Sequence, residues 1–164
     1  MTKHENELDE LYRRHAPAAF RRARRLLGSQ ADAYEVVHDV FLSLFERPEQ
    51  FAKQSSMSTF LYSAVTHACL NRIRNQQTRM RLLFEEHVTT QRLATTQTTQ
   101  PENRALLRSL LQRMPEPLAE VAVYYYSDEL THEEISRVLG CSRRHVGDLI
   151  ERLSSWVREH EVAS

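Results

Sequence analysis

The sequence is poor in the residues that break helices, form cross-links or span membranes. Its 164 residues include only 3 glycines and 5 prolines, which favours helices over a turn-rich β architecture. The 2 cysteines, Cys69 and Cys141, stand far apart and alone, so we expect reduced thiols and not a disulfide framework. No apolar run is long enough to cross a membrane, and residues 1–15 are too polar for a signal peptide. We therefore expect a cytoplasmic protein with no membrane insertion.

An excess of charge is also missing, because 22 basic residues balance 22 acidic ones. A protein that binds DNA unaided needs cations to neutralise phosphates. Either DNA is therefore not the partner, or another protein supplies most of the DNA-binding affinity. The charges are nevertheless unevenly placed. No acidic residue lies between Glu49 and Glu85, and that window contains Lys53, Arg72, Arg74, Arg79 and Arg81. This distribution predicts a surface that faces a polyanion.

Residues 131–156 have the pattern of two helices joined by a tight turn. Thr131 and Glu134 have the spacing of a capping box at the start of the first helix. Gly140 can take the left-handed conformation that ends a helix, and Ser142 is a good N-cap for the second one. Apolar residues recur at helical spacing in both, namely Ile135, Val138, Leu139, Val146, Leu149, Ile150 and Leu153. The pattern predicts a helix-turn-helix.

In a helix-turn-helix the first turn of the second helix points toward the DNA major groove. Here that turn carries Arg143, Arg144 and His145, which favours DNA binding. The alternative that these residues alone leave open is an ordinary helical hairpin with solvated arginines.

The rest of the chain predicts an all-α fold of two small helical domains joined by a flexible linker. Helical apolar spacing continues over about 5–27, 30–48 and 58–77, which we assign to a first domain of residues 1–84. Residues 85–103 are rich in Thr and Gln and weak in periodicity, so we expect a linker there. The second domain, residues 104–164, then holds the remaining helices and ends with the helix-turn-helix.

The helix expected at 30–48 carries an acidic strip, Asp32, Glu35 and Asp39, at spacings of three and four. Paired carboxylates can serve acid–base or metal chemistry, but no nucleophile or ligand pair stands beside them. A docking strip for a basic partner, or a solvated face, fits better. We also interpret the arginines at 13–25 as a solvated face.

Two other pairs, His67 with Cys69 and Cys141 with His145, lack the four-ligand spacing of a zinc site. We therefore expect no catalytic residue, no metal and no cofactor.

Four segments together resemble the extracytoplasmic-function (ECF) group of bacterial RNA polymerase sigma factors. They are DAYEVVHDVFL at 32–42, FLYSAVTHACLNRIR at 60–74, LTHEEI at 130–135 and LGCSRRHV at 139–146. Each segment alone is modestly specific, whereas their order and spacing together are highly specific. The resemblance implies a non-enzymatic protein whose partners are core RNA polymerase, promoter DNA and an anti-sigma factor. Core polymerase would then supply most of the DNA affinity, which agrees with the neutral net charge.

The resemblance also implies three sets of site residues. The set that docks on core polymerase is Asp32, Glu35, Val36, Asp39, Val40 and Leu42. The set that melts and reads the minus-ten promoter element is Gln54, Ser55, Ser56, Asn71, Arg72, Arg74, Asn75 and Arg79. The set that reads the minus-thirty-five element is Thr131, Ser142, Arg143, Arg144, His145, Asp148 and Arg152.

Several residues depart from the family pattern. Tyr34 and His38 stand where an acidic or amide side chain is usual, and Phe60 replaces a tryptophan. In the last helix Asp148 and Glu151 would repel phosphates if they faced DNA. These departures leave two alternatives open: a stand-alone helix-turn-helix regulator, and a sigma-like protein that no longer initiates transcription.

Overall fold

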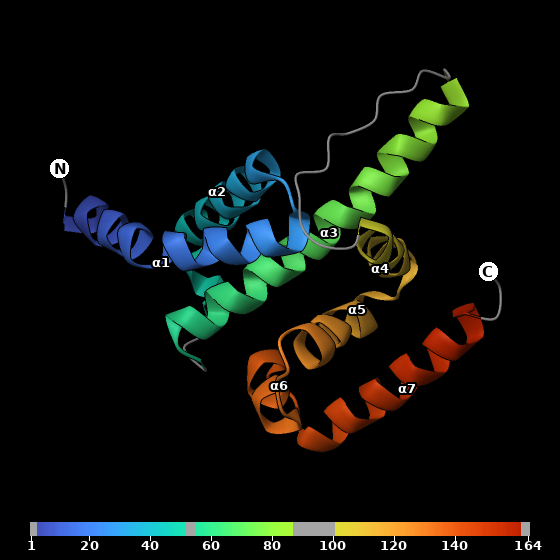
Figure 1. The fold of residues 1–164 in the computed structure, drawn as a ribbon. Coiled ribbons are helices and arrows are strands. Elements are labelled where there is room, and N and C mark those ends of the chain that lie inside the picture. The colour runs from blue at the N-terminus through green and yellow to red at the C-terminus, as the bar shows by residue number, and fades with distance from the viewer. Residues whose placement is uncertain (1–2, 52–54, 87–100, 162–164) are drawn as a thin grey trace. The chain divides into compact units, whose positions relative to one another are not determined.

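The computed structural model describes residues 3–51, 55–86 and 101–161, and every regular element in them is a helix (Figure 1). The prediction of an all-α fold is therefore confirmed. The chain divides into two compact units, Met1–Arg113 and Met114–Ser164. Among the described helices, none combines the length and apolar character needed to cross a membrane.

The first unit begins with two antiparallel helices joined by a short turn. Helix α1 (Lys3–Leu27) ends where Gly28 takes the left-handed conformation (φ 72°), and the Gly28 N–H donates to the carbonyl of Arg24 over 2.8 Å. Helix α2 (Gln30–Glu46) starts directly afterwards, because the Ser29 hydroxyl accepts a hydrogen bond from the Asp32 N–H at 3.2 Å. One 3-10 turn, η1 (Pro48–Gln50), then leads toward α3.

Helix α3 (Met57–Glu86) packs against both α1 and α2. The contact between the three helices is lined by buried side chains, among them Ala23, Ala33, Phe41, Val65 and Cys69. Alanines at such contacts let helix backbones approach closely. Burial raises the pKa of the Cys69 thiol to about 12, so it stays protonated at neutral pH, as expected of a core thiol.

Helix α4 (Pro101–Arg113) packs on α3 within the same unit. Arg108 Nη1 donates to the carbonyl of Leu27 at 3.3 Å, and Gln112 Nε2 donates to the carbonyl of Ile73 at 3.4 Å. The sequence analysis assigned residues 104–113 to the second domain, whereas in the structure α4 packs with the helices of the first unit. Most of the predicted linker, residues 87–100, lies outside the described residues, and its expected ends at 85–86 and 101–103 are helical. The functional domain limits themselves stay predictions.

The second unit consists of α5 (Glu116–Ala122), the π-helical turn η2 (Val123–Ser127), α6 (His132–Leu139) and α7 (Arg143–Glu161). Helix α7 packs against α5 and α6, and the core is formed by Tyr124, Ile135, Val146 and Leu153. Of the three consecutive tyrosines at 124–126, Tyr124 is buried and Tyr126 is exposed.

Candidate functional site

The acidic strip lies on α2, and its three carboxylates are not equally accessible. Glu35 and Asp39 are exposed, whereas the Asp32 side chain is only 29% exposed. Of the apolar residues predicted beside them, Leu42 is exposed and Val40 is half-buried. Val36 belongs to the core, where it fixes the helix and offers almost no surface to a partner.

Arg72 holds the acidic strip against α3. Its Nη2 lies 3.3 Å from Asp32 Oδ1, and it also donates a hydrogen bond to Glu35. Gln76, one turn later on α3, donates to Asp32 Oδ2 at 3.2 Å. The hydrogen bond to Glu35 and the nearby charge of Asp32 raise the pKa of Arg72. Arg72 was predicted to contact promoter DNA, but in the described chain its guanidinium is engaged with α2.

The loop that precedes α3 is fixed at both ends. Ser56 caps the helix, because its hydroxyl accepts from the Thr59 N–H at 3.2 Å. Before the loop, the Phe51 ring lies edge-on to Phe60 with centroids 5.5 Å apart. Among the predicted site residues Ser55 is half-buried and Ser56 is exposed, while Gln54 lies outside the described residues.

Asn71, Arg74 and Asn75 share one face of α3, because residues three and four apart are neighbours on a helix. Arg74 Nη1 approaches Asn71 Oδ1 at 3.5 Å, and Asn75 is exposed one turn from Asn71. Arg79 continues the exposed surface one turn beyond Asn75. Amides and guanidiniums are thus grouped on this face, and these are the groups that hydrogen-bond base edges and phosphates.

The helix-turn-helix is fixed by local hydrogen bonds. The Glu134 N–H donates to Thr131 Oγ1 at 3.3 Å, and Glu134 Oε2 accepts from the Thr131 N–H at 2.8 Å, which completes the predicted capping box. Gly140 is left-handed (φ 65°), and Ser142 accepts from the His145 N–H at 3.1 Å. Thr131 and Ser142 therefore act as helix caps, and their predicted contact with DNA stays a prediction.

The predicted reading residues of α7 form an exposed surface. Val146, Leu149 and Leu153 are buried on the opposite side of the helix, which turns the polar residues outward. The exposed set is Arg143, Arg144, His145, Asp148 and Arg152. The surface is mainly cationic, with Asp148 as the acid among these predicted residues.

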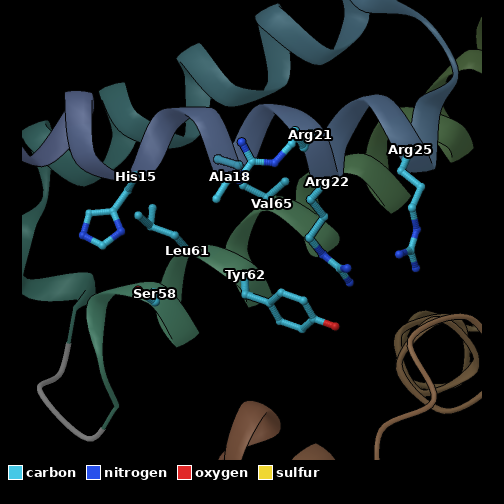
Figure 2. A pocket seen from close by; sticks show the side chains of 10 residues that line it. His15, Ala18, Arg21, Arg22, Arg25, Ser58, Leu61, Tyr62 and Val65 are labelled. Carbon is cyan, nitrogen blue, oxygen red and sulfur yellow. The ribbon is translucent and has the colours of Figure 1, made fainter.

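One pocket in the first unit was not found from the sequence. It is an open groove of about 420 Å³ between α1 and the first half of α3 (Figure 2). Its lining residues are His15, Ala18, Ala19, Arg21, Arg22, Arg25, Ser58, Leu61, Tyr62 and Val65. The prediction that the arginines of α1 form a solvated face is wrong for Arg22, which is half-buried. Its guanidinium lies 3.7 Å from the Tyr62 ring centroid, and its Nε donates to Thr66 Oγ1 at 2.7 Å.

Comparisons with known proteins find similarity to bacterial sigma factors. Residues 11–79 match the family model for Sigma-70 region 2. The chain is 25% identical to the RNA polymerase sigma factor YlaC of Bacillus subtilis, in an alignment that covers 99% of this chain and 96% of YlaC. It is 26% identical to the ECF RNA polymerase sigma factor SigE of Mycolicibacterium smegmatis, of which it spans 60%.

A solved structure is also similar in fold. It is the sigma factor RpoE from Bartonella quintana in complex with the anti-sigma factor NepR, with a TM-score of 0.50, 14% identity and 94% of both chains covered. At that identity the likeness concerns the fold alone.

Proposed function

We propose that the chain is an RNA polymerase sigma factor of the ECF group, which binds core RNA polymerase and directs it to specific promoters. The observation that carries the proposal is that both candidate surfaces lie within residues 11–79, the segment that matches Sigma-70 region 2. The region 2 match includes both the acidic strip of α2 and the amide and guanidinium face of α3. One compact unit thus presents a surface for a basic protein and a surface for DNA.

The proposed polymerase-docking surface is centred on Glu35, Asp39 and Leu42. Exposed carboxylates beside an exposed leucine suit an interface with an apolar centre and charged rim. Asp32 supports this surface through its contacts with Arg72 and Gln76. Val36 and Val40 contribute mainly by packing α2 onto the core.

The proposed minus-ten surface runs from the loop before α3 to Arg79. Asn71, Arg74 and Asn75 would contact bases or backbone of the opened strand, and the loop at 54–58 would receive a flipped base. We assign Arg72 a smaller direct role than Arg74, because its guanidinium already neutralises Asp32 and Glu35.

The proposed minus-thirty-five surface is the exposed start of α7. Arg143, Arg144 and His145 occupy the first turn after the Ser142 cap, which is the part of a recognition helix that reaches base edges. Asp148 can accept a hydrogen bond from a cytosine amino group, and Arg152 can hold a phosphate.

We further propose that the chain supplies recognition and strand opening and leaves the chemistry to the polymerase. It would act in the cytoplasm, where polymerase and promoters are found. An anti-sigma factor is proposed as its inhibitor, because the similar fold from Bartonella quintana was solved with such a partner.

Two alternatives compete with this function. A stand-alone helix-turn-helix regulator would bind DNA and not polymerase, whereas a sigma-like protein without initiation activity would bind polymerase and not start transcripts. The acids Asp148 and Glu151 in the recognition helix favour the second alternative over the first.

Co-purification of the full chain with core polymerase, followed by run-off transcription, separates the three possibilities. Asp39→Arg should weaken holoenzyme assembly at least ~10-fold, which corresponds to about 1.4 kcal/mol. The matched control is Glu159→Arg, which makes the same charge change at an exposed position of α7 outside the proposed surfaces.

Arg74→Ala and Arg144→Ala should weaken promoter complexes while leaving polymerase assembly intact. If Asp39→Arg assembled as well as Glu159→Arg, the docking surface would be wrong. If the wild-type chain assembled but gave no run-off product from any promoter recovered with it, the protein would be a sigma-like scaffold.

A further inference from the structure

The second unit carries an exposed aromatic patch at the turn between α5 and α6 (Figure 1). The patch consists of Tyr125, Tyr126 and His132, whose rings are neighbours. Tyr126 is 63% exposed, and the other two residues are half-buried beside it. A single exposed tyrosine needs no explanation, but three rings grouped on one surface indicate a contact site.

The geometry of the rings indicates what kind of group they contact. The centroids of Tyr125 and Tyr126 lie 4.9 Å apart with the ring planes at 85°, so the two rings form the walls of a corner. The centroids of Tyr125 and His132 lie 5.7 Å apart with the planes at 57°. Because the face of an aromatic ring carries a negative potential, neighbouring faces of this kind attract a cation.

Local hydrogen bonds hold the patch in place. Both tyrosines lie in the π-helical turn η2, after which the Asp128 N–H donates to the carbonyl of Val123 at 3.0 Å. The Leu130 N–H donates to the carbonyl of Tyr124 at 2.9 Å, and the capping box fixes the first turn of α6, where His132 lies. The rings are therefore positioned before a ligand arrives, which lowers the entropy cost of binding.

The patch lies in a part of the chain whose full charges are all negative. Residues 114–136 contain six acidic residues and neither Lys nor Arg, and they include α5, η2 and most of α6. Glu129 and Glu133, on either side of the capping residue, are both exposed. Arg137, which lies 3.4 Å from Glu133, bounds this segment. A surface of this sign repels phosphates, so the charge favours a cationic occupant over a nucleic acid.

We propose that the aromatic patch is a docking surface for an arginine-bearing segment of a protein partner. A guanidinium stacks on the Tyr126 ring, and Glu129 and Glu133 supply negative charge around it. Arginine fits better than lysine, because its planar group stacks on aromatic faces and donates in pairs to carboxylates. The second unit thus presents a surface for a basic protein in addition to the cationic start of α7. The proposal does not depend on the sigma function.

The first test measures binding at the patch with a defined probe. The probe is an arginine-rich helical peptide, and the control peptide carries citrulline, which keeps the shape of arginine without its charge. Amide proton–nitrogen NMR spectra of the full chain report on the patch through Tyr126 and Glu129 and on the acidic strip of α2 through Glu35. Saturable shifts at the patch with the arginine peptide alone support the proposal. Equal shifts with citrulline, or shifts confined to α2, overturn it.

The second test separates the ring from the charge. Tyr126→Leu removes the aromatic face and should weaken binding of the arginine peptide about 3-fold, whereas Tyr126→Phe should bind like the wild type. Glu129→Gln should also weaken binding, and Glu159→Gln, the same charge change at an exposed position of α7, should not. Thermal unfolding checks that each variant is folded. Wild-type binding by Tyr126→Leu, or equal losses for the two glutamate variants, would overturn the proposal.

Other occupants are outcomes of the same NMR measurement. If spermidine bound the patch as tightly as the peptide does, the occupant would be a free polyamine and the docking surface would be wrong. If a DNA duplex shifted the Tyr126 and Glu129 amides, the charge argument would fail. The measurement uses the free chain, so it is independent of polymerase. Failure of holoenzyme assembly with normal peptide binding rejects the sigma function alone, and the reverse result rejects the docking surface alone.

Discussion

The two units position their functional side chains by opposite means. In the first unit, Arg72 reaches Asp32 forty positions earlier in the chain, and Arg22 reaches Thr66, so tertiary packing determines where each cation lies. In the second unit, Arg143 and Arg144 are oriented by caps within a few residues of them. Arg72 and Arg22 therefore take part in the packing of the first unit, whereas Arg143 and Arg144 stay exposed on α7.

The largest expected effect tests whether the two units are separate folding units. Phe41→Ala removes a ring that is 1% exposed and lies edge-on to Tyr12, so the first unit should lose about 3–5 kcal/mol. Leu42→Ala, one residue later and 45% exposed, should change stability by less than about 0.5 kcal/mol. Urea unfolding with hydrogen exchange should show lost protection in α1–α3 and retained protection in α6 and α7. An equal loss of hydrogen-exchange protection in both units would show that they do not unfold separately.

A matched pair of arginine substitutions tests the contrast itself. Arg72→Met leaves Asp32 without its cation at a half-buried position, so the first unit should lose about 1–2 kcal/mol. Arg144→Met, at an exposed position, should cost less than about 0.5 kcal/mol in stability while weakening promoter binding. Adding Asp32→Asn to Arg72→Met should recover part of the loss in a double-mutant cycle. If both arginines cost the same, packing does not distinguish them.

Two glycines of the helix-turn-helix, Gly140 and Gly147, should respond in opposite ways to substitution by alanine. A Cβ at Gly140 or at Gly147 would meet no atom within 4 Å, so space is equal at both positions. Gly140 has φ +65°, and Gly140→Ala should therefore destabilise the unit by about 1–2 kcal/mol. Gly147 lies inside α7, and Gly147→Ala should stabilise it by about 0.5–1 kcal/mol. Thermal unfolding monitored by circular dichroism measures both, and equal signs would contradict the capping assignment.

The smallest effect concerns pH and the capping box. Hydrogen bonds from the Thr131 N–H and hydroxyl hold the pKa of Glu134 below its usual value. Because the folded pKa is depressed, the stabilisation is complete above the ordinary carboxyl pKa and is lost as pH falls through the folded value. Glu134→Gln should flatten that part of the acid-unfolding profile. An unchanged profile would mean that the box does not stabilise α6.

Local signals in the sequence were sufficient for much of the fold. The capping box at Thr131 and Glu134, the left-handed Gly140 and the Ser142 cap were all predicted, because each depends on residues within three or four positions of one another. The buried stripes of α6 and α7 followed from helical periodicity in the same way. The all-α class and the resemblance to ECF sigma factors were likewise predicted from the sequence.

Contacts between distant residues were not predicted. No local pattern distinguishes Arg72, which turns to α2, from Arg74, which lies on the opposite side of the helix near Asn71. The packing of α4 on α3 depends on side chains such as Arg108, whose partner Leu27 is eighty-one residues away. The groove at Arg22 was missed for the same reason, although the absence of acids at 11–31 was a usable signal.

Asp32 contacts two α3 residues that are one helical turn apart: one carboxylate oxygen forms an ion pair with Arg72, and the other accepts a hydrogen bond from Gln76. Because the Asp32 carboxylate is contacted from two successive turns of α3, these contacts fix the register of α2 along α3. If α3 slid along α2 by one turn, about 5.4 Å, both contacts would break together. The contacts of Asp32 thus fix how the α2 face that carries Glu35 is aligned with the α3 face that carries Asn75.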